Sequence, residues 1–250
     1  MKKKNMISDK VYLELHSKIM NLNIKPGKII SIKDICNSMN ISRSPVRDAI
    51  IRLEEEGLVE SIPQVGIRIT QINFKKMEDE RYLRHCIEYK MAIDYGSKNY
   101  SLIELLKFEN NIKLQELAIK EKNYIAFLEY DDAFHEVLFE ITGRGFIWEI
   151  ILENQAHYRR MRLLALISLG DNHLKDLVEQ HKKMVEYIKS KDTDSLIKLL
   201  DLHISELVEE KFWLRDNYPE LIYSDEEYEK KDNSLLKENF YIDLIKKKKE

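Results

Sequence analysis

Apolar residues recur with the 3.6-residue period of helices along most of the chain beyond residue 72. Helix breakers are rare in this part, where Pro219 is the only proline. Three of the four prolines, Pro26, Pro45 and Pro63, lie before residue 72. We therefore expect a mainly α protein, with a compact N-terminal domain over residues 1–72 and an all-helical domain over residues 73–225.

Three short helices are predicted in the N-terminal domain. The first covers about Ser8–Leu22 and stops at "KPGK". The second starts at Ser31, with an acidic residue three positions on, which is typical of a helix N-cap. The third begins at "SP" of residues 44–45, because proline suits the first helical position, and ends at Gly57.

Two alternating segments follow the third helix, "LVES" and "IRIT", around "IPQVG". They predict a β-hairpin. Helix, short turn, helix and hairpin is the order of a winged helix-turn-helix, in which the start of the third helix enters the major groove of DNA. The N-terminal domain is therefore a candidate DNA-binding domain.

The start of the third predicted helix carries side chains suited to DNA. Arg43 and Arg47 lie one turn apart, and an arginine fork can grip guanine O6 and N7 with two bonds. Ser42 and Ser44 can bond phosphates. Gly66, at the predicted hairpin tip, would allow the backbone to approach the minor groove. The alternative is that both arginines are ordinary surface residues.

Charge and cysteine content narrow the class of protein further. Residues 1–72 hold 12 Lys and Arg against 8 Asp and Glu, whereas the remainder holds 29 against 36. A basic first part and an acidic second part suggest that only the first meets nucleic acid. Two cysteines are too few for a disulfide framework, and no apolar run is long enough to span a membrane. We expect a soluble cytoplasmic protein, with residues 226–250 as a charged C-terminal appendage of no assigned function.

Polar residues interrupt the apolar stripes of three predicted helices in the bundle. Asp131 and His135 lie four apart among leucines, and His181 and His203 each lie within a stripe of their own. A lone buried histidine is usually a hydrogen-bonded core residue, but four such groups together would suit a divalent metal, Zn, Ni, Mn or Fe. The other four histidines lack this pattern and are expected to be surface or local polar residues: His16, His85, His157 and His173.

The stretch "SIKDICNSMNISRSPVRDAIIRLEEEGLVESIPQVGIRIT", residues 31–70, closely resembles the DNA-binding domain of the GntR family of bacterial transcription regulators. The resemblance implies that the domain contacts an operator, and that Gly66 lies at the tip of the wing. The implied DNA contacts are Lys33, Ser42, Arg43, Ser44, Arg47 and Gly66.

Residues 73–215 resemble the FCD-type effector domain of the FadR branch of this family, through "LRHCIEYKMA", "DDAFHEVLFEITG" and "EQHKKMVEYIKSKDTDSLIKLLDLHI". This resemblance implies that the all-helical domain is an antiparallel bundle. The resemblance implies that Arg84 faces a cavity for a small organic acid, although a helix pair between Arg84 and Glu88 is an equal alternative. Arg144 departs from the asparagine of many relatives and leaves one pocket wall undefined. The implied metal ligands are Asp131, His135, His181 and His203.

The resemblance and the residue patterns lead to one functional hypothesis with two alternatives. The expected protein is a homodimeric regulator that binds a near-palindromic double-stranded operator and responds to a small organic acid at the metal. One alternative is a metal that is purely structural or is itself the signal. The other is a metalloenzyme fused to a DNA-binding domain. Because no clear general base or nucleophile accompanies the metal site in the sequence, we do not expect an enzyme.

Overall fold

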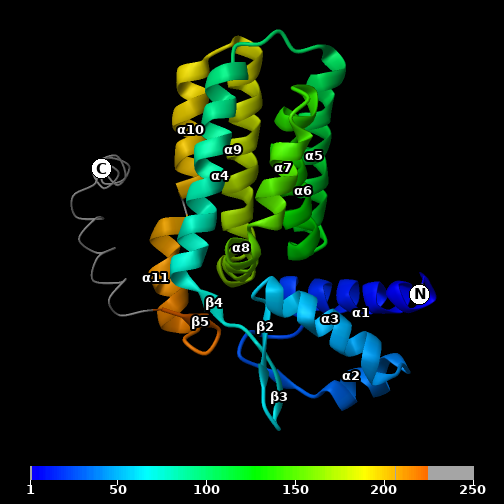
Figure 1. Ribbon diagram of the computed structural model, residues 1–250. Helices are drawn as coiled ribbons and strands as arrows, with labels where there is room; N and C mark the ends of the chain where they lie inside the picture. Colours follow the sequence, from blue (N-terminus) through cyan, green and yellow to red (C-terminus); the bar gives the residue numbers. More distant parts are fainter. Residues whose placement is uncertain (1, 206, 225–250) are drawn as a thin grey trace.

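The computed structural model describes residues 2–205 and 207–224, and the C-terminal appendage of residues 226–250 lies outside the described part. A small N-terminal domain lies beneath a tall helical bundle (Figure 1). The N-terminal domain contains α1 (Lys2–Met20), α2 (Ile32–Met39) and α3 (Arg43–Glu55). Its sheet has the antiparallel order β1 (Ile29–Ile30), β3 (Gly66–Ile69), β2 (Val59–Ile62).

Local capping explains the helices of this domain. The hydroxyl of Ser31 accepts a hydrogen bond from the backbone N–H of Asp34 at the start of α2. Helix α3 ends before Gly57, whose φ of +70° is left-handed, and the N–H of Leu58 bonds back to the carbonyl of Leu53. The predicted helices and the hairpin are therefore present, and they form a winged helix-turn-helix.

Two helix boundaries and one additional strand differ from the sequence-based expectation. Helix α1 begins at Lys2, six residues before the expected start. Helix α3 begins at Arg43 with Ser42 as its N-cap, so that Pro45 occupies the third helical position, where the N–H has no helical partner either. The short strand β1 was not expected, because two residues are too few to produce an alternating pattern.

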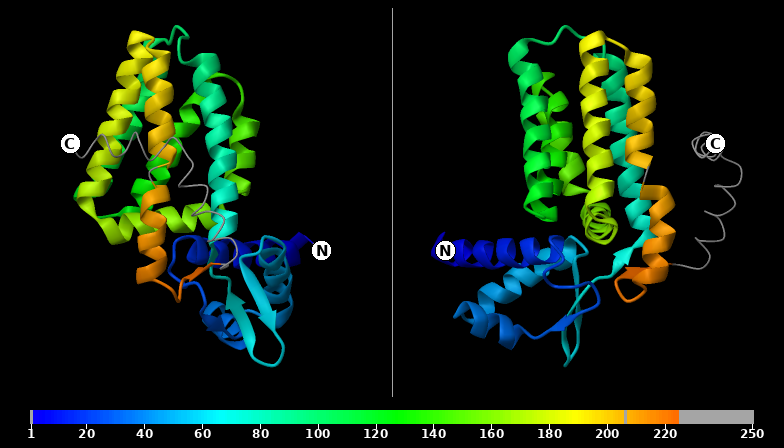
Figure 2. Two further views of the ribbon diagram at one scale, coloured as in Figure 1. Left: turned by 90° about the vertical axis from the view of Figure 1, so that its left-hand side faces the viewer. Right: turned by 180° about the vertical axis from the view of Figure 1, so that it is seen from behind.

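The bundle has long helices that run up and down along its length: α4 (Phe74–Tyr95), α5 (Leu102–Lys120), α6 (Tyr124–Ile141), α9 (Asp171–Ser190) and α10 (Thr193–Ser205). Helix α7 (Gly145–Glu153) packs beside α4 and α6. Helix α8 (Ala156–Leu169) crosses the lower end of the bundle, directly above the N-terminal domain, as both views of Figure 2 show. The transverse helix is thus placed between the two domains.

The described end of the chain returns to the linker between the domains, which comprises residues 70–74. Helix α11 (Leu207–Asn217) leads to β5 (Ile222–Tyr223), which pairs in parallel with β4 (Ile72–Asn73). This pairing was not expected from the sequence, since parallel partners far apart in the chain leave no local signal. None of the described helices has the length and apolar character needed to cross a membrane.

Candidate metal centre and nucleic-acid interface

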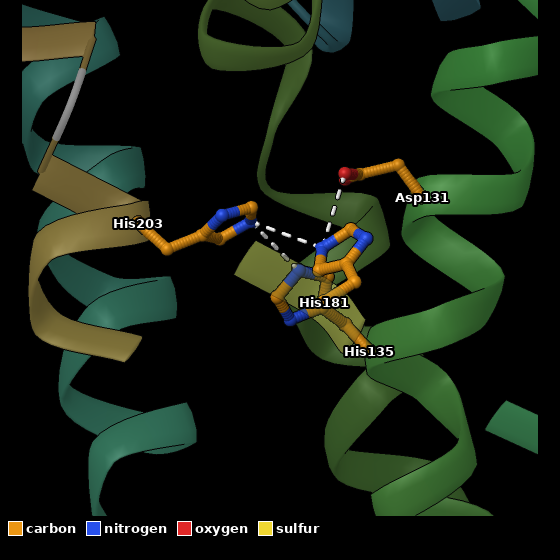
Figure 3. Close-up of side chains that lie close together, drawn as sticks. All are labelled: Asp131, His135, His181 and His203. Atoms are coloured by element: carbon orange, nitrogen blue, oxygen red, sulfur yellow. Dashed lines mark hydrogen bonds and ion pairs between the residues drawn. The ribbon is translucent and has the colours of Figure 1, made fainter. Parts of the chain in front are cut away.

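Four side chains from three helices of the bundle converge on one point (Figure 3). Asp131 and His135 lie one turn apart on α6, His181 lies on α9 and His203 on α10. One ligand atom of each residue lies within 4.8 Å of one ligand atom of every other. The i, i+4 spacing on α6 puts its two groups on the same side of the helix, as the sequence predicted.

The separations within this cluster suit a metal ion. The Nε2 atom of His203 lies 3.2 Å from Nε2 of His135 and 3.3 Å from Nε2 of His181. The Nε2 atom of His181 also lies 3.5 Å from Oδ1 of Asp131. Ligands at about 2.0–2.1 Å from a tetrahedral zinc ion are about 3.4 Å apart. The cluster is therefore close to the size that a bound divalent ion requires.

The second ring nitrogen of each histidine has a side-chain oxygen as its partner. Nδ1 of His135 lies 2.5 Å from Oε2 of Glu88, and Nδ1 of His181 lies 2.8 Å from Oε1 of Gln115. Nδ1 of His203 lies 2.7 Å from Oε1 of Gln180. Because these oxygens accept hydrogen bonds, we assign the proton of each neutral ring to Nδ1.

This assignment leaves three Nε2 lone pairs facing one another beside a carboxylate. Two acceptors cannot hydrogen-bond to each other, so the short contacts between the rings need a cation to be favourable. Burial, and the charged neighbours that oppose protonation, hold the pKa values of His181 and His203 well below the usual range. The lowered pKa values keep the rings of His181 and His203 neutral and able to bind metal. The donor set of imidazole nitrogens and one carboxylate fits a divalent ion of the Zn, Ni, Mn or Fe type.

A cavity of about 50 Å³ lies beside the cluster. Its lining includes Asp131 and His203 together with Arg84, Tyr158, Arg162 and His173. His173 and Arg162 were not among the residues selected from the sequence. The cavity is next to two metal-ligand candidates and two guanidinium groups, an arrangement that suits a small anion.

Arg84 forms the helix pair considered for it and also lies at the cavity wall. Its side chain is only 2% exposed, and its Nε donates to Oε1 of Glu88 at 2.5 Å, as a helix pair would. Its Nη1 donates to Oδ1 of Asp132 at 3.0 Å, and Arg84 also lines the cavity. Although burial opposes its charge, the neighbouring carboxylates hold the pKa of Arg84 above its usual value. Arg84 is therefore a permanent positive charge at the cavity wall.

Arg162 links the α6 part of the cluster to helix α8. Its Nη1 donates to Oδ1 of Asp132 at 2.6 Å, and its Nη2 donates to Oδ2 of Asp131. Burial would raise the pKa of Asp132, but Arg162 and Arg84 lower it to about 2. The sequence carried a usable signal for Arg162, because it lies one turn from the buried residues Tyr158 and Ala165 on the same helix.

The remaining residues singled out in the sequence lie outside this cluster. Arg144 is at the start of α7, where its Nε donates to the hydroxyl of Tyr95, and it is not among the residues that line the cavity beside the cluster. His85 pairs with Asp201 at 2.7 Å, and His16 lies 3.8 Å from Glu56. His157 is buried, and it accepts a hydrogen bond at Nδ1 from the N–H of Asn73, which makes it a local polar residue rather than a surface one.

The candidate DNA-contacting side chains of α2 and of the start of α3 are exposed on the N-terminal domain. Ser42, Arg43, Ser44 and Arg47 occupy the N-cap and first turns of α3 and are all exposed, while the opposite face of α3 is buried. Lys33 is exposed near the start of α2. These positions leave the side chains free to meet a DNA groove and its phosphates.

Gly66 lies at the first residue of β3, directly after the exposed turn of residues 63–65, and pairs with Ile62. Its φ is +153°, and a Cβ there would lie 2.6 Å from the carbonyl oxygen of Ile30. Glycine at this position therefore allows strand β1 to approach β3 closely.

A winged helix-turn-helix joined to a helical bundle is the architecture of a class of DNA-binding transcription regulators. Residues 7–69 match the family model for "Bacterial regulatory proteins, gntR family", and residues 83–206 match that of the FCD domain. The chain belongs to the GntR family and carries an FCD domain. It is a transcription regulator of that family.

Known proteins of this kind resemble the chain over most of its length. The HTH-type transcriptional repressor RspR of Escherichia coli K12 is 28% identical over 203 residues, which cover 81% of this chain and 88% of that protein. An uncharacterized HTH-type regulator of Streptomyces ambofaciens is 25% identical over 215 residues, covering 86% and 89%. The solved structure of E. coli McbR/YncC superimposes with a TM-score of 0.68 at 15% identity, covering 85% of this chain and 98% of that one. The structural match supports the fold.

Proposed function

We propose that this regulator holds a divalent metal in its helical domain and that a small carboxylate bound beside the metal changes its affinity for an operator. Residues 1–72 form the DNA-binding unit in this proposal, and residues 73–225 form the effector and dimerisation unit. The regulator would act on operator DNA in the cytoplasm. The observation that carries the proposal is the convergence of three Nε2 lone pairs and one carboxylate, with every Nδ1 atom held by an oxygen.

The metal would be held by Asp131, His135, His181 and His203. A bound divalent ion supplies positive charge and open coordination positions for an anion. Glu88, Gln115 and Gln180 fix the ring orientations, which keeps the Nε2 atoms directed at the ion. Metal analysis of the purified protein tests this step, and His181→Ala should lose most of the bound metal.

Charge balance supports a small acid as the effector. Glu88, Asp131 and Asp132 contribute three negative charges, against two positive charges from Arg84 and Arg162. A divalent ion would change this net charge from −1 to +1. The cavity of about 50 Å³ has room for a few water-sized groups, which suits an acid of two to four carbons.

DNA recognition would come from the exposed start of α3, with Lys33 on α2 and the turn before Gly66 at the edges. A homodimer would place two such heads on a near-palindromic operator. Tyr82, Tyr89 and Ile93 form an exposed apolar stripe along α4, which supports a subunit interface on that face. Light scattering would measure the oligomeric state, and footprinting would show whether two half-sites are protected.

A thermal-shift screen of small mono-, di- and hydroxy-acids on metal-loaded protein is the first experiment. An acid at 100 times its Kd should stabilise the native state by about 2.7 kcal/mol. A hit that is lost in His181→Ala and that changes operator affinity at fixed salt supports the proposal. A hit that never changes operator affinity refutes the regulatory role of the acid.

The second candidate is a structural or sensory metal, which is favoured by the small cavity and by the existing partners of Arg84. In that case chelation would collapse stability or operator binding, and no acid in the screen would stabilise the protein. Turnover of an acid that binds would instead identify an enzyme.

A further inference from the structure

Helix α8 contacts both the candidate metal centre and the DNA-binding domain, and it does so within one turn. Arg162 bonds Asp131 and Asp132 at the cluster. Arg160, two residues earlier, is fully buried, and its Nη1 donates to the carbonyl oxygen of Thr70 at 2.8 Å, in the linker to the DNA-binding domain. Residues two apart on a helix are only about 3 Å apart along its axis. A movement of this part of α8 therefore affects both contacts.

Further hydrogen bonds attach the start of α8 to the linker and to α1. The N–H of Asn73 donates to Nδ1 of His157 at 3.0 Å. Nη2 of Arg159 donates at 3.4 Å to Oδ1 of Asn21, the residue that follows α1. The backbone N–H groups of His157 and Tyr158 both donate to a carboxylate of α4. A rotation or shift of α8 must therefore alter the position of the DNA-binding domain relative to the bundle.

Two buried polar atoms at the junction between the domains have no hydrogen-bond partner. Among the described residues, Oε1 of Gln155 and Nη1 of Arg159 are buried without a hydrogen-bond partner. Both residues line a cleft of about 810 Å³ between the N-terminal domain and the bundle. Buried polar groups without partners are costly. A second arrangement of the domains that gave these two atoms partners would recover that cost, and the cleft leaves room for such a change.

We propose that Arg162 reports the occupancy of the metal centre to the DNA-binding domain, acting through α8 as a positioning residue. The proposal rests on the metal and effector function proposed above. When Oδ1 of Asp131 ligates a cation, less negative charge remains on Oδ2 for Arg162. An acid anion in the cavity competes for the same guanidinium, because Arg162 lines that cavity. Either event loosens the contact of α8 with α6 and shifts the contacts of Arg160 and His157 with the linker.

Hydrogen exchange of the linker tests this without knowledge of the operator. Full-length wild type, Arg162→Gln, Arg162→Lys and the control Arg144→Gln would be compared before and after loading with Zn²⁺, and again with glycolate added. The readout is the exchange rate of backbone amides in residues 70–74, which include the Asn73 N–H bonded to His157. Zinc content would be measured in every sample.

In wild type and in Arg144→Gln, zinc or zinc with glycolate should change linker exchange at least threefold. In Arg162→Gln the change should disappear although zinc still binds, and Arg162→Lys should restore part of it. An equal change in Arg162→Gln, or no change in wild type that binds zinc, overturns the proposal.

Failure of wild type to bind zinc would refute the proposed metal function instead. The relay would then be judged by Arg162→Gln alone: altered linker exchange relative to Arg144→Gln supports it, and unaltered exchange overturns it.

Discussion

Gln115 offers a direct test of the metal centre, because it is not itself a metal-ligand candidate. Its side chain is fully buried on α5, its Oε1 lies 2.8 Å from Nδ1 of His181, and its Nε2 donates to the carbonyl oxygen of Tyr130 at 3.2 Å. Gln115→Leu would keep a side chain of similar volume and remove the acceptor. The ring of His181 would then lose the group that fixes its orientation and tautomer.

The expected loss follows from these contacts. Removing an outer partner of a metal-bound histidine typically weakens metal binding by about 10- to 100-fold, or about 1.4–2.7 kcal/mol. The metal-free protein should also lose about 1–3 kcal/mol of stability, since the N–H of His181 would be left buried without an acceptor. Phe134, which stacks on His181 at 4.0 Å between ring centroids, would still hold the ring in place, so binding should weaken rather than vanish.

Competition for zinc against a chromophoric chelator would measure the affinity, and chemical denaturation with and without chelator would measure the stability. Gln115→Glu is the control for the acceptor, because it loses the donor to Tyr130 as Gln115→Leu does but keeps an oxygen that accepts from Nδ1 of His181, so it should bind zinc more tightly than Gln115→Leu. Zinc binding by Gln115→Leu at the wild-type affinity would show that this hydrogen bond does not orient a ligand, and would refute the reasoning.

Three further substitutions test other parts of the molecule. Arg47→Ala should weaken specific operator binding by about 1–3 kcal/mol while leaving affinity for random DNA unchanged in fluorescence anisotropy; equal weakening on both would make it a phosphate contact. Gly66→Ala should lower the melting temperature, because its Cβ would lie 2.6 Å from the carbonyl oxygen of Ile30, whereas Val65→Ala in the exposed turn should not. His157→Gln tests a pH dependence: burial first, and nearby cations second, lower the pKa of His157 to about 3 from an ordinary 6.5. Its contribution to the free energy of unfolding is therefore present above about pH 6.5 and is lost as the pH falls toward 3, so the variant should lose less stability than wild type between pH 7 and pH 5 in urea titrations.

The DNA-binding domain was largely predictable because its signals are local. The cap at Ser31, the proline at position 45 and the left-handed Gly57 each act on the few residues beside them. The N-cap of α3 lies two residues earlier than expected, at Ser42 rather than Ser44, since serine is a good cap at either position and the choice depends on packing. The pairing of β4 with β5 could not be predicted, because it joins two-residue strands about 150 positions apart.

The metal-ligand candidates were recognisable because polar groups interrupted apolar stripes, and the same signal extends to their partners. On α5, Gln115 lies in the spacing of the buried residues Phe108, Ile112 and Ala118, as His181 does on α9. The sequence does not tell which of these polar residues meet, since that depends on how three helices pack. Geometry supplied that step by placing Oε1 of Gln115 on Nδ1 of His181.

The charges around the cluster also imply an order of events. Without a cation the site has more carboxylates than guanidinium groups, and Asp132 already occupies both Arg84 and Arg162. An incoming acid anion would then meet a net negative site in which its best donors are engaged. A divalent ion would reverse that balance and withdraw charge from Asp131, which would free part of the Arg162 guanidinium for an anion. In the proposed function we therefore expect metal to bind before the acid, and we expect a monoanion to neutralise the loaded site where a dianion would leave it negative again. The helix pair of Arg84 with Glu88 does not exclude the proposed role of Arg84 toward an acid, because the pair holds a positive charge at the cavity wall.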